Sequence, residues 1–327
     1  MYKRKESYKM KIVMPEYGTL TIGDIDMSGF EKFGDLQVLD CPSRSELKAA
    51  LKDADILFVN KTSVDEDLLE YAEKLVYVGE CATGFNNIDL DYCKSRGITV
   101  TNVPAYSTNA VAQLVFAFIL EHFSKVHAYD ELVRADGWIN SPVFSVFDIP
   151  MEELDGKTLG LFGYGQIGSK VAKISSAFGM KVYATTRSRQ SGSDEYTEFV
   201  PFDTLLEKSE IISCHCPLNP ESEKIMNAEA FAKMQKGAYF INTSRGPVVD
   251  EAALAQALKS GHLSGASVDV LETEPMSKDC PLIGIENCVI TPHMAWAPKD
   301  TRQRLVNIVT ENLNAYLEGH PQNVVGG

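Results

Sequence analysis

The chain has 327 residues, of which 44% are hydrophobic and 23% charged, as is typical of a globular protein long enough for two domains. Its formal net charge of −14 argues against nucleic acid or an anionic membrane as a partner, because their phosphates would repel it. The longest apolar stretch, residues 111–120, is too short to cross a bilayer. No apolar segment follows the polar start, and the seven cysteines are scattered, so we expect a cytoplasmic protein with reduced thiols and no signal peptide.

Short apolar runs alternate with helical patterns in the first hundred residues. Residues 1–10 are polar, and we expect them to be a frayed extension. The predicted strands that follow are residues 11–14, 37–39, 55–59, 75–78 and 98–101. Helices are predicted between them at 45–51, with Ser45 as the N-cap, and at 65–72. This alternation indicates a doubly wound parallel sheet.

A second α/β region follows Pro104. A long apolar helix is predicted from Ser107 to Phe123, and an amphipathic helix at 301–317 closes the chain. The predicted strands of this region are 158–162, 181–185, 210–214, 238–242, 265–268 and 288–290. We expect the last helix to pack back on the first region.

The strand at 158–162 runs directly into a Gly-x-Gly-x-x-Gly motif, and an apolar-periodic helix follows it. Gly163 permits the tight turn, Gly165 lets the backbone approach a pyrophosphate, and Gly168 lets the helix pack closely on the strand. The N-terminus of the helix offers N–H groups and partial positive charge to phosphates. A second strand arrives at the spacing of a βαβ unit, so the motif predicts dinucleotide binding.

The predicted architecture is therefore α/β, with two doubly wound parallel-sheet domains. A Rossmann dinucleotide-binding domain of residues 105–293 is inserted in a flavodoxin-like substrate domain. The substrate domain comprises residues 1–104 and 294–327. Ligands in such folds bind at the carboxyl ends of the strands, in the cleft between the domains.

Three later strands each end in a segment with conspicuous polar residues. Arg245 follows one strand, where a guanidinium can bind a carboxylate through two parallel hydrogen bonds; a surface salt bridge is the alternative. Asp269 and Glu274 follow the next strand, and ordinary turn acids are the alternative there. Of the six histidines, His293 alone lies at a strand exit beside a proline.

Together these strand ends form a consistent catalytic set. Reduction of a 2-keto acid by hydride transfer needs a cation for the carboxylate, an acid that protonates the new alkoxide, and a group that holds the proton of that acid. Arg245, His293 and Glu274 supply one of each. No metal is expected, because the Cys-His-Cys run at 214–216 has no second ligand pair at zinc-finger spacing and is typical of a buried strand end.

On these residues the chain resembles the D-isomer-specific 2-hydroxyacid dehydrogenases, over residues 11–325. The shared segments are residues 163–168, 242–246, 269–275 and 291–293. The resemblance implies that Arg245 clamps the substrate carboxylate, that Glu274 and His293 are the acid/base pair, and that Asp269 lies near the nicotinamide. It also implies that backbone N–H groups of Ala82, Thr83 and Gly84 bind the substrate. The cofactor contacts that it implies are Gly163, Gly165, Gln166, Ile167, Gly168, Cys216, Thr243, Asp269 and His293.

Within this family the chain is most similar to the glycerate dehydrogenases, also called hydroxypyruvate reductases. Residues 102–108, 147–150 and 293–297 carry this closer likeness. It implies reduction of hydroxypyruvate or glyoxylate to the D-2-hydroxy acid by NAD(P)H, and a homodimer. Short-form phosphoglycerate dehydrogenase and a dinucleotide-sensing, corepressor-like binding protein are the alternatives, whereas Glu274 argues against a formate dehydrogenase, which has glutamine there.

The end of the second nucleotide-binding strand departs from the usual NAD pattern. An acid that bonds the ribose 2′-hydroxyl is usual there. This chain has Thr186, Arg187, Ser188 and Arg189. An acid would repel a 2′-phosphate, whereas two arginines and two hydroxyl groups would bind it. We therefore expect NADP(H) to be preferred over NAD(H), with a solvated turn in an NAD enzyme as the alternative.

Overall fold

A computed structural model describes residues 9–326, and the chain divides into two compact units. Unit 1 contains the residues up to Tyr106 and those from Ala297 onward, whereas unit 2 is Ser107–Trp296. The limits expected from the sequence differ from these by only a few residues. Residues 1–8 of the expected extension lie outside the described residues, and Met10 already belongs to the first strand.

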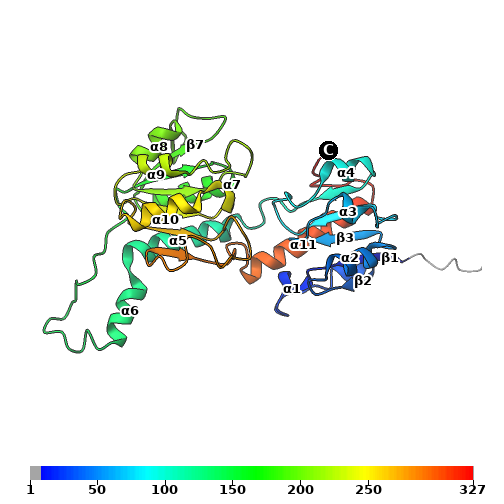
Figure 1. Ribbon diagram of the computed structural model, residues 1–327, viewed down its shortest axis with the longest axis horizontal. Helices are drawn as coiled ribbons and strands as arrows, with labels where there is room; N and C mark the ends of the chain where they lie inside the picture. Colours follow the sequence, from blue (N-terminus) through cyan, green and yellow to red (C-terminus); the bar gives the residue numbers. More distant parts are fainter. Residues whose placement is uncertain (1–8, 327) are drawn as a thin grey trace, which may run out of the picture. The chain divides into compact units, whose positions relative to one another are not determined.

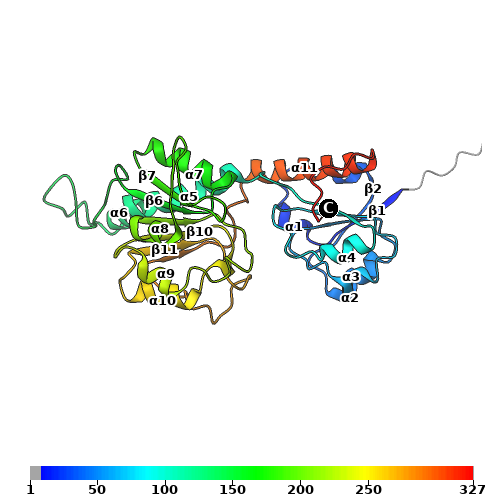
Figure 2. The ribbon, with the colours of Figure 1, turned by 90° about the horizontal axis from the view of Figure 1, so that it is seen from above.

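Unit 1 is built on a five-stranded parallel sheet (Figures 1 and 2). Its strands are β1 (Met10–Met14), β2 (Gly34–Val38), β3 (Ile56–Val59), β4 (Tyr77–Glu80) and β5 (Thr99–Thr101). Their order is β2-β1-β3-β4-β5, which is the predicted flavodoxin-like order.

Strand β4 lies two residues later than the prediction of 75–78. Leu75 and Val76 precede the strand, although their apolar side chains favoured it. Glu80 belongs to the strand, pairs with Val59 of β3, and is only 1% exposed. Apolar patterning cannot identify a buried acid as a strand residue, which explains the error.

The helices of unit 1 are α1 (Tyr17–Leu20), η1 (Phe30–Lys32), α2 (Arg44–Leu51), α3 (Glu66–Leu69), α4 (Leu90–Ser95) and α11 (Lys299–Leu317). The expectation that Ser45 caps α2 is wrong, because Ser43 is the N-cap and forms a reciprocal capping box with Glu46. Ser45 has no acid three residues later, whereas Ser43 has one. As expected, α11 packs on unit 1: the ring of Tyr316 lies 4.9 Å from that of Tyr77.

Unit 2 is built on a seven-stranded parallel sheet (Figures 1 and 2). Its strands are β6 (Thr158–Phe162), β7 (Lys181–Thr185), β8 (Glu198–Phe199), β9 (Ile211–Cys214), β10 (Tyr239–Asn242), β11 (Gly265–Val268) and β12 (Cys288–Ile290). The strand order is β12-β11-β10-β9-β6-β7-β8. Strands β7 and β8 extend the sheet on one side of β6, and β9 to β12 extend it on the other side, as in the predicted Rossmann fold. The two-residue edge strand β8 is too short for the sequence to signal.

Helices cover both faces of this sheet, so most of its strand residues are buried. The helices of unit 2 are α5 (Thr108–Ser124), α6 (Val126–Arg134), α7 (Gln166–Ala177), α8 (Phe202–Lys208), α9 (Ala228–Lys233), η2 (Gly246–Val248) and α10 (Glu251–Lys259). One core lies between the sheet and α5 and α7, the other between the sheet and α8, α9 and α10. Among residues 9–326, no helix is both long and apolar enough to span a membrane.

Candidate active site

The glycine motif forms the turn from β6 into α7. Gly163 has a φ of +102°, and a Cβ there would collide with the backbone of His215 and Cys216. A Cβ at Gly168 would collide with the carbonyl oxygen of Gly163. Gly165 is the N-cap of α7, and apart from its two chain neighbours no described residue lies within 4 Å of where its Cβ would be. The N-terminus of α7 is therefore open to an anion such as a pyrophosphate.

This turn forms one wall of a pocket at the carboxyl ends of β6, β7 and β9. The pocket has a volume of about 660 Å³, within the range of small-ligand and cofactor sites. Its other walls are the turn at 185–190, the rings of Phe199 and Phe202, and residues of the segment 215–222. Two of the residues expected to bind the cofactor, Gln166 and Ile167, lie in the first turn of α7. Seven others line the pocket: Gly163, Gly165, Thr186, Arg187, Ser188, Arg189 and Cys216.

The turn after β7 places two cations on this pocket. The backbone N–H of Arg189 donates to Oγ1 of Thr186 at 2.9 Å, which closes the turn. The Arg189 guanidinium lies over the ring of Phe199, 3.7 Å from its centre, and donates to the carbonyl of Ser193. Arg187 pairs with Glu221 at 3.6 Å, and both side chains are largely exposed. Glu221 is the one carboxylate among the described residues that line the pocket, so two cations face one anion.

Arg245 lies three residues beyond β10, in a loop fixed by its neighbours. The amide of Asn242 donates to the Arg245 carbonyl at 2.9 Å, and its oxygen accepts from the backbone and hydroxyl of Ser244. The guanidinium donates from Nη1 to the carbonyl of Ser244 at 2.7 Å. No carboxylate in the described part of the chain pairs with Arg245, which removes the surface salt bridge as an explanation for it. Its half-buried guanidinium retains donors for an anionic ligand.

Glu274 and His293 come from the segments after β11 and β12 and meet in an ion pair. Nδ1 of His293 lies 2.7 Å from Oε2 of Glu274, and Oε1 of Glu274 accepts the backbone N–H of Leu271. The two side chains are 26% and 34% exposed, so the pair is partly shielded from water. Within residues 9–326, no hydrogen bond engages Nε2 of His293. This arrangement can hold a proton on the imidazole and deliver it from Nε2.

Asp269 holds the loop that carries His293. It is 1% exposed, and its carboxylate accepts hydrogen bonds from the hydroxyl of Thr291 and from the backbone N–H groups of Met294 and Ala295. Its carbonyl accepts the N–H of His293 at 2.8 Å. His293 itself has a φ of +51°, a left-handed conformation rare for residues with a Cβ. Asp269 thus maintains an uncommon backbone conformation at the histidine.

The segment at 82–84 lies in unit 1, directly after β4. The carbonyl of Ala82 accepts the N–H of Val103 at 2.9 Å, and that of Thr83 accepts the amide of Asn102 at 2.7 Å. The hydroxyl of Thr83 donates to the carbonyl of Val103. Among residues 9–326, no acceptor engages the N–H groups of Ala82, Thr83 and Gly84. The loop is therefore anchored by its oxygens and presents free N–H donors.

Sequence reasoning missed His215 at this edge. His215 follows β9 and lines the nucleotide pocket, where burial lowers its pKa to about 4 and keeps the ring neutral. Ser213 hydrogen-bonds its Nε2 at 2.9 Å. Burial also raises the pKa of the neighbouring Cys216 to about 11. The expected cofactor contact Thr243 is buried, and its hydroxyl has no partner among the described residues. The signal available for His215 was its place at a strand exit, the same signal that identified His293.

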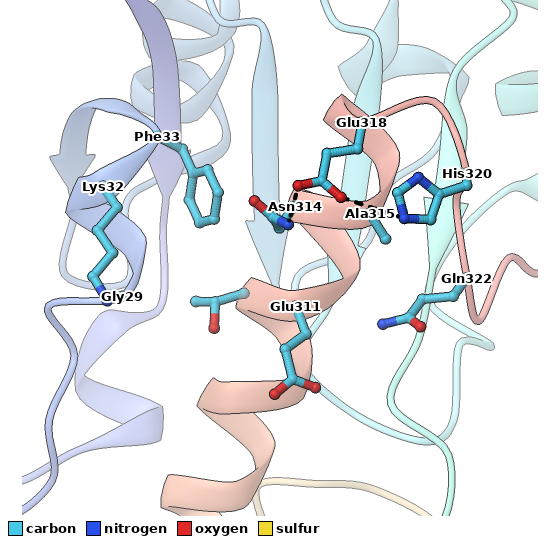
Figure 3. A pocket seen from close by; sticks show the side chains of 10 residues that line it. Gly29, Lys32, Phe33, Glu311, Asn314, Ala315, Glu318, His320 and Gln322 are labelled. Carbon is cyan, nitrogen blue, oxygen red and sulfur yellow. Dashed lines mark hydrogen bonds and ion pairs between the residues drawn. The ribbon is translucent and has the colours of Figure 1, made fainter.

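Another hollow lies in unit 1, between α11 and the segment around η1 (Figure 3). Its most prominent acid, Glu318, is already engaged by its neighbours. Asn314 donates to one of its oxygens at 2.9 Å, and His320 lies 3.3 Å from the other. We assign no chemistry to this hollow.

The carboxyl edge of the unit 2 sheet thus combines a nucleotide pocket with an arginine and a glutamate–histidine pair, as in an NAD(P)-dependent dehydrogenase. The family model "D-isomer specific 2-hydroxyacid dehydrogenase, NAD binding domain" matches residues 116–295. A hydroxypyruvate reductase of Blautia hydrogenotrophica is 41% identical over 97% of this chain and 99% of its own length. The chain belongs to the D-isomer-specific 2-hydroxyacid dehydrogenase family.

Solved structures agree with this membership. The NADPH-dependent glyoxylate/hydroxypyruvate reductase of Sinorhizobium meliloti, solved with NADP and malonate, has a TM-score of 0.83, is 26% identical, and is matched over 97% of both chains. The D-lactate dehydrogenase of Aquifex aeolicus, solved with NAD and lactic acid, has a TM-score of 0.82 and is 29% identical, over 97% of this chain and 99% of its own. Structures similar to this chain have thus been solved with NADP and with NAD. Family membership alone therefore does not determine which of the two cofactors this chain binds.

Proposed function

We propose that this protein reduces hydroxypyruvate and glyoxylate to the D-2-hydroxy acids, with unit 2 as its dinucleotide-binding domain and unit 1 as its substrate domain. The observation that carries the proposal is the set of Arg245, Glu274 and His293 at three adjacent strand ends of the nucleotide-binding sheet. The activities named for the relatives in Blautia and Sinorhizobium support the substrate class. All seven cysteines are free thiols, which supports a reducing, cytoplasmic location.

Different residues of the site bind the substrate, donate the proton and position the proton donor. Arg245 binds the substrate carboxylate, which leaves the keto group to the histidine. In unit 1, the family resemblance implies that the free N–H groups of 82–84 are donors to the substrate. A bound NAD(P)H would supply the hydride that reduces C2. His293 donates the proton from Nε2 to the oxygen on C2, and Glu274 stabilises the imidazolium through Nδ1. Asp269 holds the His293 loop, and the Thr243 hydroxyl, which has no partner among the described residues, would be available to the nicotinamide end of a bound cofactor.

Steady-state kinetics with both cofactors and four keto acids (glyoxylate, hydroxypyruvate, pyruvate and a branched keto acid) test this function. We expect turnover of hydroxypyruvate and glyoxylate, followed by the loss of NAD(P)H absorbance. Absence of turnover on all four acids, together with measurable dinucleotide binding, would instead favour a dinucleotide-sensing binding protein.

We also propose that NADP(H) is the preferred cofactor. Two guanidinium groups and the hydroxyls of Thr186 and Ser188 border the pocket where an acid would otherwise contact the ribose. Arg189 is held in place by Phe199 and Ser193, so it loses little freedom on binding a phosphate. Charge-assisted hydrogen bonds contribute about 1.5–3 kcal/mol each. One such bond to the 2′-phosphate corresponds to a kcat/KM for NADPH about tenfold or more above that for NADH.

We expect kcat/KM to be about tenfold higher for NADPH than for NADH in the parent protein. The double change Thr186→Asp with Arg187→Ala should reverse the preference, because it removes one cation and adds a repulsive charge. Glu221→Gln is the matched control: it frees Arg187 and should raise the preference for NADPH. A kcat/KM for NADH at or above that for NADPH in the parent would show that the arginines do not bind the cofactor.

We propose further that the protein is a homodimer. The segment from α6 to Met151 projects from its sheet, and α6 has no buried residue (Figure 1). Its exposed apolar side chains include Val126, Trp138, Ile139, Phe144 and Phe147, with Phe144 90% exposed. Such a concentration of apolar surface marks an interface, and a second copy of the chain can bury it in two-fold symmetry. The family resemblance implies the same assembly.

Light scattering after size exclusion tests the assembly. We expect the parent to have twice the mass of the chain, and Phe144→Asp with Phe147→Asp to shift it to the monomer. Ile22→Asp, at a similarly exposed apolar residue of unit 1, is the matched control and should stay dimeric. A monomeric parent would refute the proposal.

A further inference from the structure

Unit 2 contains a buried acid, in the first turn of α10, that the proposed function does not use. Glu251 is only 8% exposed, although acidic side chains are rarely buried without a partner. Its Oε1 accepts the backbone N–H of Glu272 at 2.6 Å, and its Oε2 lies 3.6 Å from Sγ of Cys280. Burial raises the pKa of the Cys280 thiol, so the thiol stays protonated and can donate. The two oxygens of one side chain thus bind both ends of segment 272–280, whose residues up to 279 are exposed and include Glu274.

A second contact fixes the peptide between Leu271 and Glu272. A Cβ at Gly246 would collide with the carbonyl group of Leu271 and with the nitrogen of Glu272, so only a glycine lets the two backbones lie this close. Gly246 directly follows Arg245, the proposed substrate clamp. The peptide that donates its N–H to Glu251 is therefore also packed against the loop that carries Arg245.

The N–H group of Leu271 connects this peptide to the catalytic pair. It donates to Oε1 of Glu274 at 3.0 Å, which leaves Oε2 of Glu274 for Nδ1 of His293 at 2.7 Å. Hydrogen bonds therefore run from Glu251 through residues 271–272 to the Glu274 carboxylate, with a single residue of backbone between the two contacts. Supporting hydrogen bonds of this kind fix the orientation of a functional side chain.

The charged groups around Glu251 have other partners. The carboxylate of Glu272 pairs with Nζ of Lys224 at 2.8 Å, and Asp250 caps the backbone of α10. The nearby thiol of Cys288 is neutral, because burial raises its pKa to about 12. Within the part of the chain that the structure describes, no cation pairs with Glu251. Its role therefore depends on where its oxygens lie, and not on an ion pair.

We propose that Glu251 is a positioning residue that keeps the Glu274 carboxylate against His293; this inference rests on the proposed function, in which that pair delivers the proton. Glu251 acts through the backbone: it bonds the N–H of Glu272, so that the N–H of Leu271 stays directed at Oε1 of Glu274. Without this contact, Glu274 moves away from Nδ1, and the imidazolium of His293 is stabilised less.

Two variants of Glu251 separate the reach of the side chain from its charge. Glu251→Asp keeps the charge but is one methylene shorter, so its oxygens no longer reach the N–H of Glu272. Glu251→Gln keeps the length and an acceptor oxygen but loses the charge. If Glu251 acts by position, only the Asp variant should weaken the contact between Glu274 and His293.

Titration of His293 by NMR measures that contact without requiring turnover. The signal of His293 in protein with isotope-labelled histidine is assigned by its loss in His293→Ala. We expect the titration midpoint to fall by about 0.5 pH units or more in Glu251→Asp, which is about a threefold loss of proton affinity, and by less than about 0.2 pH units in Glu251→Gln. Asp269, the other carboxylate at the His293 loop, is unchanged in every variant. The pH at which keto-acid reduction is lost should fall together with the midpoint.

Glu229→Asp is the matched control, because Glu229 is also an acid in the first turn of a helix, α9, and pairs there with Lys233 at 3.0 Å. Its midpoint should equal that of the parent. A merely structural role of Glu251 would lower stability and leave the midpoint of His293 unchanged in Glu251→Asp, which would overturn the inference. An equal fall in Glu251→Asp and Glu251→Gln would also overturn it, since charge alone would then be responsible.

A further variant decides the question if Glu251→Asp does not fold. Cys280→Ala removes the other contact of the same carboxylate. A lowered midpoint of His293 in this variant supports the inference, and a midpoint equal to that of the parent overturns it. If the parent reduces none of the keto acids, the proposed function fails, whereas the titration still reports whether Glu251 positions Glu274.

Discussion

His293→Ala should lower kcat for keto-acid reduction by about 10²–10⁴, the usual contribution of a positioned general acid. The reason lies in the geometry of the pair. Nδ1 is bonded to Glu274 at 2.7 Å, and Nε2 has no partner within the described residues, so one ring nitrogen holds a proton for the substrate. Without the imidazole, the alkoxide would form with no proton donor beside it. Single-turnover and steady-state reduction of hydroxypyruvate measure the loss, and the Kd for the cofactor should change far less.

Two further variants distinguish loss of the proton donor from a general loss of activity. His320→Ala removes a histidine that also pairs with a glutamate, in unit 1, and should leave kcat near the parent value. Glu274→Gln keeps the shape of the acid but removes the charge that stabilises the imidazolium. Reduction should then be lost at lower pH than in the parent, since the protonated acid is the active form. A pH profile of Glu274→Gln that overlays the parent would contradict the pairing.

Arg245→Lys should raise KM for the keto acid by about tenfold or more, with cofactor binding close to normal. Lysine keeps the positive charge but loses the planar pair of donors that fits a carboxylate, and one charge-assisted hydrogen bond is worth about 1.5–3 kcal/mol. The Asn242 and Ser244 contacts hold the loop through its backbone, so the change should act at the guanidinium alone. Initial rates over a range of hydroxypyruvate concentrations, at saturating cofactor, measure the effect.

Arg96→Lys is the matched control for that change. Arg96 bonds the carbonyls of Leu69 and Ala72 in unit 1, so its guanidinium also acts through hydrogen bonds. Its replacement should cost some stability and leave KM near the parent value. A KM in Arg245→Lys that equals the parent value would remove Arg245 from the substrate site.

Local patterns made most of the fold predictable. The glycine motif depends on three positions whose constraints are steric, and Gly163 and Gly168 meet neighbouring backbone as those constraints require. The strand ends of β10, β11 and β12 were recognisable because short, mainly apolar strands run into polar loops. Membership of one sheet then places Arg245, Asp269 and His293 along one edge.

Other features depended on distant parts of the chain. The side chain of Glu80 is buried beside Glu16, Lys61 and Asn87, which are distant from it in the sequence or follow the strand, so its raised pKa could not be predicted from the strand alone. His215 is neutral and lines the nucleotide pocket because of tertiary burial, whereas its sequence context suggested only a buried strand end. The segment from α6 to Met151 also depended on the structure. Apolar residues usually indicate a core, and only the structure shows that side chains such as Phe144 are exposed.

The stereochemistry of the product tests the central claim most directly. Hydroxypyruvate is reduced to completion with NADPH and the purified parent protein, and the glycerate formed is resolved on a chiral column. A dehydrogenase of this family, acting through Arg245 and His293 as described, should form D-glycerate in stoichiometric amounts with the NADPH consumed. Formation of L-glycerate, or no glycerate from a folded protein that binds NADPH, would contradict it.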